Sequence, residues 1–165
     1  MDRRTFLAGI GAAGVLSLPF GAALAQSKKP VVGLVMKSLA NEFFKNMQEG
    51  AVQHVQQLGT CELIPLGIQS ETDIDGQIAL VENLITRKVD AIVIAPADSR
   101  ALIPPLVRAA KAGIKLVNID VLLNANDLKK HHIDIVFVGP DNREGAKMSA
   151  DVLAKALGAG GKVVI

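Results

Sequence analysis

The sequence is short of aromatic residues and of cysteine, and each shortage excludes something. Its 165 residues include no Trp, no Tyr, five Phe and one Cys. A single cysteine cannot form an internal disulfide. Cys61 stands at the start of an apolar strand with no neighbour that would activate a thiolate, so a buried structural thiol is predicted. The formal net charge of +2 argues against a nucleic-acid partner.

Catalytic and metal-binding motifs are also missing. The sequence has no G-x-S-x-G elbow, no P-loop and no H-E-x-x-H zinc motif, so we predict no enzyme, no catalytic residue and no cofactor. Adjacent His131 and His132 would point apart and lack a second ligand cluster, which favours a solvated loop over a metal site. Residues 9–14 match G-x-G-x-x-G, but no strand precedes them, so no dinucleotide site is predicted.

The first 25 residues are predicted to be an export signal. Arg3 and Arg4 are followed by an apolar stretch over residues 6–18 that is too short to span a bilayer, and small residues at 23–25 form a cleavage site before Gln26. The paired arginines also resemble the twin-arginine signal, and they occur in ordinary secretory signals too. Because Gln26 is not a cysteine, no lipid anchor is indicated, and we expect a soluble protein exported to the periplasm.

Apolar runs and helical periodicity alternate along the rest of the chain. This alternation predicts a parallel α/β sheet with helices on both faces. Strands are predicted at residues 31–36, 62–66, 91–95, 115–119 and 135–138, and helices at 43–58, 74–85, 102–110 and 142–157. Pro65 suits a strand near the sheet edge, and residues 121–134 are predicted to form a loop. A further strand would begin at Lys162, so we expect the chain to be a fragment that stops inside a strand.

The segment from Lys37 to Phe44 carries the clearest functional signal. A cation, an amide and two flat rings follow the first strand, which suits a ligand with polar edges and apolar faces, such as a sugar. The alternative is that both Phe are core residues; neighbouring helical residues point about 100° apart, so only one is expected there. Asn41 can also cap the helix, and Asp98 is expected to cap a helix rather than touch ligand. Because Lys37, Asn41 and Asp120 fall at the carboxyl ends of parallel strands, they are predicted to converge.

Four stretches then carry a family resemblance. The matching stretches are, in order, residues 32–44 (VGLVMKSLANEFF), 95–99 (APADS), 115–120 (KLVNID) and 139–145 (GPDNREG). In these stretches the chain resembles the N-terminal half of type I periplasmic sugar-binding proteins of the ribose/allose-binding group. The match is closer to the allose branch, because Lys37 stands where that branch has Lys. Val121 replaces the Arg of ribose binders and cannot make its bidentate contacts, which argues against ribose as ligand.

The resemblance implies a sugar held between two lobes that close around it. It implies that Lys37 and Asn41 hydrogen-bond hydroxyls, that Phe43 and Phe44 stack on or wall the sugar ring, and that Asp120 binds a pair of hydroxyls. Residues 26–138 would form an incomplete N-terminal lobe, and residues 139–165 the crossover and the truncated start of the second lobe.

The family resemblance also implies a role and partners. The protein would be the periplasmic solute-binding component of an ABC importer for a neutral monosaccharide or sugar alcohol, working with a membrane permease and ATPase. A binding protein that serves a chemoreceptor or sensor kinase is the alternative, and an exported α/β enzyme is a weaker one. Regulators of the lactose-repressor type share this fold but carry a helix-turn-helix where this chain has a signal peptide.

Overall fold

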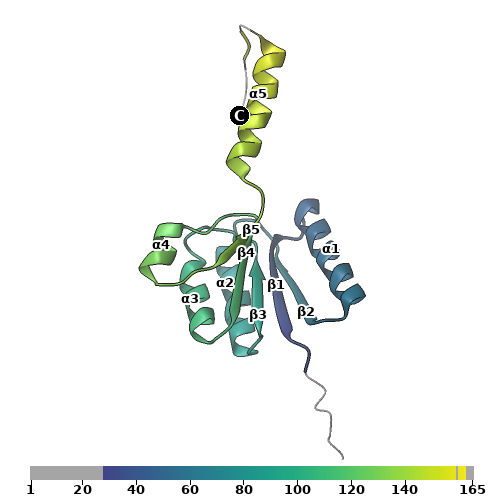
Figure 1. Ribbon diagram of the computed structural model, residues 1–165, viewed down its shortest axis with the longest axis vertical. Coiled ribbons are helices and arrows are strands. Elements are labelled where there is room, and N and C mark those ends of the chain that lie inside the picture. The colour runs from purple at the N-terminus through teal and green to yellow at the C-terminus, as the bar shows by residue number, and fades with distance from the viewer. Residues whose placement is uncertain (1–27, 159, 163–165) are drawn as a thin grey trace, which may run out of the picture.

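A computed structural model describes residues 28–158 and 160–162 as a parallel sheet flanked by helices, which confirms the predicted fold class (Figure 1). The predicted signal peptide and the glycine motif at 9–14 lie outside the described residues. Lys162 is coil, and the rest of the strand predicted to begin there also lies outside them.

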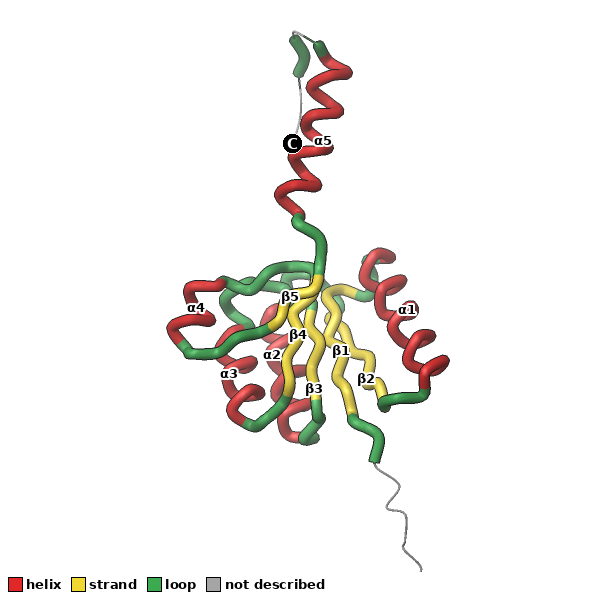
Figure 2. The backbone as a smooth tube through the Cα atoms, viewed as in Figure 1, coloured by secondary structure: helices red, strands yellow, loops and turns green. Residues whose placement is uncertain are grey.

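The sheet has five parallel strands in the order β2-β1-β3-β4-β5 (Figure 2). They are β1 (Val31–Ser38), β2 (Glu62–Ile68), β3 (Ala91–Ile94), β4 (Lys115–Ile119) and β5 (Val136–Val138). Pro65 therefore lies on an edge strand, as predicted, where a missing N–H does not interrupt pairing on both sides. The chain leaves β1 toward β2 on one side and returns to β3 on the other. This reversal places a topological switch point at the carboxyl ends of β1 and β3, where α/β proteins bind ligands.

Five helices connect and follow these strands: α1 (Glu42–Leu58), α2 (Ile74–Thr86), α3 (Ile103–Lys111), α4 (Ala125–Lys130) and α5 (Asn142–Leu157). Gly59 ends α1 with φ 61°, a left-handed conformation that glycine adopts without steric cost. The loop predicted over 121–134 was partly wrong, because it contains α4. This helix has six residues and buries none of them, so it leaves no apolar period in the sequence. The Asn124 side chain caps it by accepting from the Asp127 N–H at 3.1 Å.

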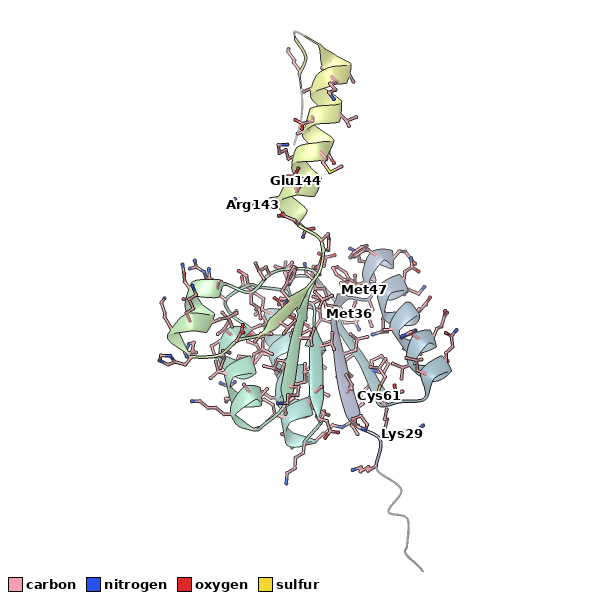
Figure 3. All side chains as sticks on the ribbon, viewed as in Figure 1. Lys29, Met36, Met47, Cys61, Arg143 and Glu144 are labelled. Carbon is pink, nitrogen blue, oxygen red and sulfur yellow. The ribbon has the colours of Figure 1, made fainter. Side chains whose placement is uncertain are left out.

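Two apolar clusters hold α2 and α3 to one face of the sheet and α1 to the other. The larger one packs α2 and α3 against the side chains of Val35, Ile92 and Ile94. The smaller one packs α1 against Leu34 and Met36. Figure 3 labels Met36 on β1, a buried member of this cluster, and Met47 on α1, which packs against the cluster. The alternation of Leu34, Val35 and Met36 between the clusters shows why β1 must be apolar on both faces.

The edges of the lobe are more exposed to solvent than its centre. Cys61, predicted to be buried, is only partly buried, because it directly precedes the edge strand β2 at the rim of the sheet. β5 forms the opposite edge, and its Val136 and Val138 are exposed. Figure 1 shows α5 standing clear of the sheet, and its apolar side chains, such as Val152, are exposed.

Candidate ligand-binding site

Lys37, near the end of β1, and Asp120, directly after β4, lie together at the carboxyl end of the sheet. The Lys37 Nζ atom is 3.9 Å from Asp120 Oδ2 and 5.3 Å from the centroid of the Phe44 ring. Both side chains are largely buried, with 14% of Lys37 and 17% of Asp120 exposed. A separation of 3.9 Å exceeds a hydrogen bond, so a ligand hydroxyl can bridge the two charged groups.

Asn41 joins this cluster from the N-terminus of α1 and has two roles. Its Oδ1 atom caps the helix by accepting from the Phe43 N–H at 3.0 Å, as the sequence allowed. Its Nδ2 atom donates to Glu71 Oε1 at 2.6 Å. Glu71 Oε2 is in turn 3.9 Å from Lys37 Nζ, so this carboxylate reaches two of the predicted ligand residues.

Only one of the two phenylalanines is a core residue, as their helical spacing predicts. Phe44 is 4% exposed and packs in the core with Leu34 and Met36. Phe43 is 56% exposed, and its ring meets the Phe44 ring edge to face at a centroid distance of 5.1 Å. Phe43 therefore offers an apolar surface at the rim, while Phe44 forms a floor below the Lys37 ammonium.

The backbone at Asp120 is held in an uncommon conformation. Asp120 has φ 63°, in the left-handed region that aspartate tolerates better than most residues. Asn118, which is 1% exposed, brackets it: its Nδ2 atom donates to the carbonyls of Ile119 at 3.1 Å and Val121 at 2.8 Å. Its Oδ1 atom accepts from the Leu123 N–H at 2.9 Å. These bonds fix the turn that aims the Asp120 carboxylate.

Gln77 ties together the strand ends beneath the site. This α2 side chain is fully buried. Its Nε2 atom donates to the carbonyls of Met36 at 3.2 Å and Ala95 at 2.9 Å, and its Oε1 atom accepts from the Ala97 N–H at 2.7 Å. Gln77 therefore links the carboxyl ends of β1 and β3 at the topological switch point.

The predicted helix cap at Asp98 was wrong, because its side chain holds the turn before α3 rather than the start of the helix. Its Oδ1 atom accepts from the backbone N–H groups of Arg100 at 2.8 Å and Ala101 at 2.7 Å, in the turn that leads into α3. The helix itself begins later, at Ile103, without a side-chain cap. The hydrogen bonds from the Ala101 and Arg100 N–H groups hold the pKa of Asp98 below its usual value.

The pKa of Asp120 is raised above its ordinary value of 3.8. Burial is the largest cause, the Lys37 ammonium opposes it, and the Glu71 carboxylate adds to it. Sugar hydroxyls donate to an ionised carboxylate, so the binding-competent form is the deprotonated one. This form predominates at pH values above the raised pKa and is lost as the pH falls through it.

Because Asp120 is a predicted ligand residue, we expect affinity for the predicted sugar ligand to decline on acidification before an ordinary aspartate would titrate. Calorimetric titrations from neutral to acidic pH measure this acid limb, and Asp120→Asn should remove it because an amide does not titrate. An affinity that stays constant down to pH values below 3.8 would contradict the role of Asp120.

A hollow of about 610 Å³ opens beside Asp120, within the size range of small-molecule sites. It is lined by Asp120, Val121, Leu122, Phe137 and residues 139–143, and the other four predicted ligand residues do not line it. A second hollow, of about 580 Å³, lies at the opposite end of the sheet beside Lys88, Asp90 and Lys115. The first is the better candidate, because it adjoins the convergent polar cluster.

Three residues of the site were missed by sequence reasoning. Glu71 follows β2 after two polar residues, so the rule that singled out Lys37 and Asp120 would have found it. Asn118 and Gln77 are polar residues at positions that the apolar patterns of β4 and α2 mark as buried, which is itself a signal.

Within residues 28–158 and 160–162, no group of three or more His, Cys, Asp or Glu side chains is placed to hold a metal ion. His131 and His132 are both exposed, after α4. In the same part of the chain, every helix is too short or too polar to cross a bilayer.

A parallel α/β lobe with a polar and aromatic cluster at its carboxyl edge is the architecture of a ligand-binding domain. The periplasmic binding protein domain matches residues 32–165, so the chain belongs to the periplasmic binding protein family. It is 47% identical over 150 residues to a D-ribose/D-allose-binding protein of Pseudomonas aeruginosa, covering 90% of this chain and 47% of the relative. It is 35% identical to the D-allose-binding periplasmic protein of Escherichia coli, covering 80% and 43%.

Solved structures give the same class. An ABC transporter solute-binding protein from Burkholderia multivorans is 52% identical with a TM-score of 0.79, covering 81% of this chain and 48% of that one. A solute-binding protein from Actinobacillus succinogenes with bound D-allose is 39% identical with a TM-score of 0.74, covering 79% and 45%. The chain thus spans about half the length of the relatives it matches.

Proposed function

We propose that this chain forms one lobe of a periplasmic solute-binding protein that takes a neutral monosaccharide or sugar alcohol at the carboxyl end of its sheet. The main observation behind the proposal is that Lys37 and Asp120 lie close enough for one ligand hydroxyl to bind both. The Lys37 ammonium lies over the Phe44 ring, and Asn41 is linked to the same cluster through Glu71. An ammonium and a carboxylate supply donors and acceptors for hydroxyls, and the aromatic rings accept the C–H face of a sugar.

The site binds and does no chemistry in this proposal. Asp120 has a raised pKa, but no nucleophile with a base is evident beside it among the described residues. The relatives support this, since they are named as binding proteins for D-ribose, D-allose or transporter solutes.

The wider setting is also proposed. Residues 1–25 direct export, residues 26–138 form the N-terminal lobe, and residues 139–165 cross to a second lobe that supplies the other wall of the cleft. The relatives' lengths support the second wall, because this chain spans about half of each. The partners are an ABC permease and its ATPase, with a chemoreceptor as a further candidate.

The test is calorimetry on the complete gene product after removal of residues 1–25. A panel of pentoses, hexoses, polyols and amino acids should give tight, reversible binding to a neutral sugar or polyol. Allose should bind better than ribose, because Val121 cannot make the contacts of an arginine. Tight binding of an amino acid and of no carbohydrate would overturn the proposal.

A further inference from the structure

We propose that Glu71 is a positioning residue of the sugar site, which holds Lys37 away from Asp120 and fixes Asn41, so that these groups stay open to the ligand. The inference rests on the proposed function for the identity of the ligand.

The Glu71 carboxylate divides its two oxygens between two predicted ligand residues. Oε1 accepts a hydrogen bond from Asn41 Nδ2 at 2.6 Å, and Oε2 lies 3.9 Å from Lys37 Nζ. One side chain from the loop between β2 and α2 thereby links the end of β1 to the first turn of α1.

The loop that carries Glu71 is anchored to β1 on its β2 side. The Ser38 hydroxyl donates to the Gln69 carbonyl at 2.9 Å, and the Leu39 N–H donates to the Ile68 carbonyl at 3.2 Å. Because these bonds fix the residues just before Glu71, its carboxylate has a defined place relative to Lys37 and Asn41.

The spacing of the three charges explains why such a residue is needed. The Lys37 ammonium is 3.9 Å from a Glu71 oxygen and 3.9 Å from an Asp120 oxygen, so it is shared between two carboxylates. Lysine is a mobile point charge on a flexible stem. Without Glu71, Lys37 would close on Asp120 as a direct ion pair and occupy the acceptors that sugar hydroxyls need.

Two further charged residues, Asp141 at the N-cap of α5 and Arg143 in its first turn, line the hollow beside Asp120. The hollow therefore presents one positive and one negative side chain to Asp120, whereas Glu71, from the loop between β2 and α2, adds a negative charge alone. A simple surface ion pair is the competing explanation, since 44% of the Glu71 side chain is exposed. Such pairs contribute little to stability and would leave the site unchanged when removed.

The first experiment needs no sugar. Carbon-13 NMR titration of the Asp120 carboxyl in the mature gene product compares wild type with Glu71→Gln and Glu82→Gln. Glu82 is a matched control, because its side chain is 41% exposed and pairs with Arg108, away from the site. Glu71→Gln should lower the pKa of Asp120, because a repelling carboxylate is lost and Lys37 moves closer; Glu82→Gln should leave it unchanged. An unchanged Asp120 titration in Glu71→Gln overturns the proposal.

The second experiment measures affinity for the best neutral sugar. Glu71→Ala should bind about tenfold more weakly or worse, and Glu71→Gln, which keeps an acceptor for Asn41, should lose less. The acid limb of the affinity should move to lower pH in Glu71→Gln. If wild type binds sugar and Glu71→Ala binds equally well, the positioning role is wrong while the proposed function stands. If wild type binds no sugar but Glu71→Gln shifts the Asp120 titration, the proposed function fails while the electrostatic coupling of Glu71 to the Lys37–Asp120 pair stands.

Discussion

Replacing Asp120 by alanine is expected to weaken sugar binding by about two orders of magnitude or more. A carboxylate desolvated against two hydroxyls makes charge-assisted hydrogen bonds worth about 1.5–3 kcal/mol each, and roughly 1.4 kcal/mol is a factor of ten in affinity. Asp120 is suited to this role because it is largely buried and aimed by the Asn118 turn. Calorimetry on the mature gene product measures the loss directly.

Two further variants separate ligand contact from backbone strain. Asp120 has φ 63°, which asparagine adopts more readily than alanine, so Asp120→Asn should keep the turn and lose only the charge. Its loss of affinity should be smaller than that of Asp120→Ala but still clear. Asp98→Ala is the matched control; by removing the hydrogen bonds of the turn before α3 it should lower folding stability by about 0.5–1.5 kcal/mol, with little change in affinity. Binding by Asp120→Ala within about threefold of wild type would remove Asp120 from the site.

Gln77→Leu is expected to cause the largest loss of stability among these substitutions. It leaves the Met36 and Ala95 carbonyls and the Ala97 N–H without their side-chain partner in a buried region. A buried polar group left unpaired costs about 1–3 kcal/mol, so three of them correspond to about 3 kcal/mol or more of the free energy of unfolding. That is a large share of the roughly 5–15 kcal/mol that stabilises a typical protein.

Urea unfolding of the mature gene product measures this loss. Gln53→Leu is the control, because Gln53 is exposed on α1, and surface changes of this kind stay within about 0.5 kcal/mol. A midpoint for Gln77→Leu close to that of wild type would show that the strand ends are held by other contacts.

The fold was predictable because its signals are strong and repeated. Strands buried on both faces must be continuously apolar, so β1 and β3 stand out as Val- and Ile-rich runs, and α5 is bounded by residues 142 and 157 as its composition predicted. The short helix α4 left no such signal, because capping by Asn124 rather than an apolar face defines its start.

The site was predictable where one rule applies, namely that the carboxyl ends of parallel strands converge. This rule correctly placed Asp120 near Lys37 and Asn41, although Asp120 is far from both in sequence. Sequence could not say that Lys37 would be shared between two carboxylates, because that depends on the distance across three loops. Nor could it say that Phe44 rather than Phe43 would be the core residue, because both occupy the same apolar motif and only packing against Met36 decides.

The central claim is that a neutral sugar binds at this carboxyl edge, and a crystal structure of the complete gene product with its best ligand tests it most directly. We expect a sugar hydroxyl within hydrogen-bond distance of both Asp120 and Lys37, with a face of the sugar ring against the exposed Phe43. Ligand density at the opposite hollow beside Lys88 and Lys115, with the Lys37 and Asp120 groups unengaged, would contradict it.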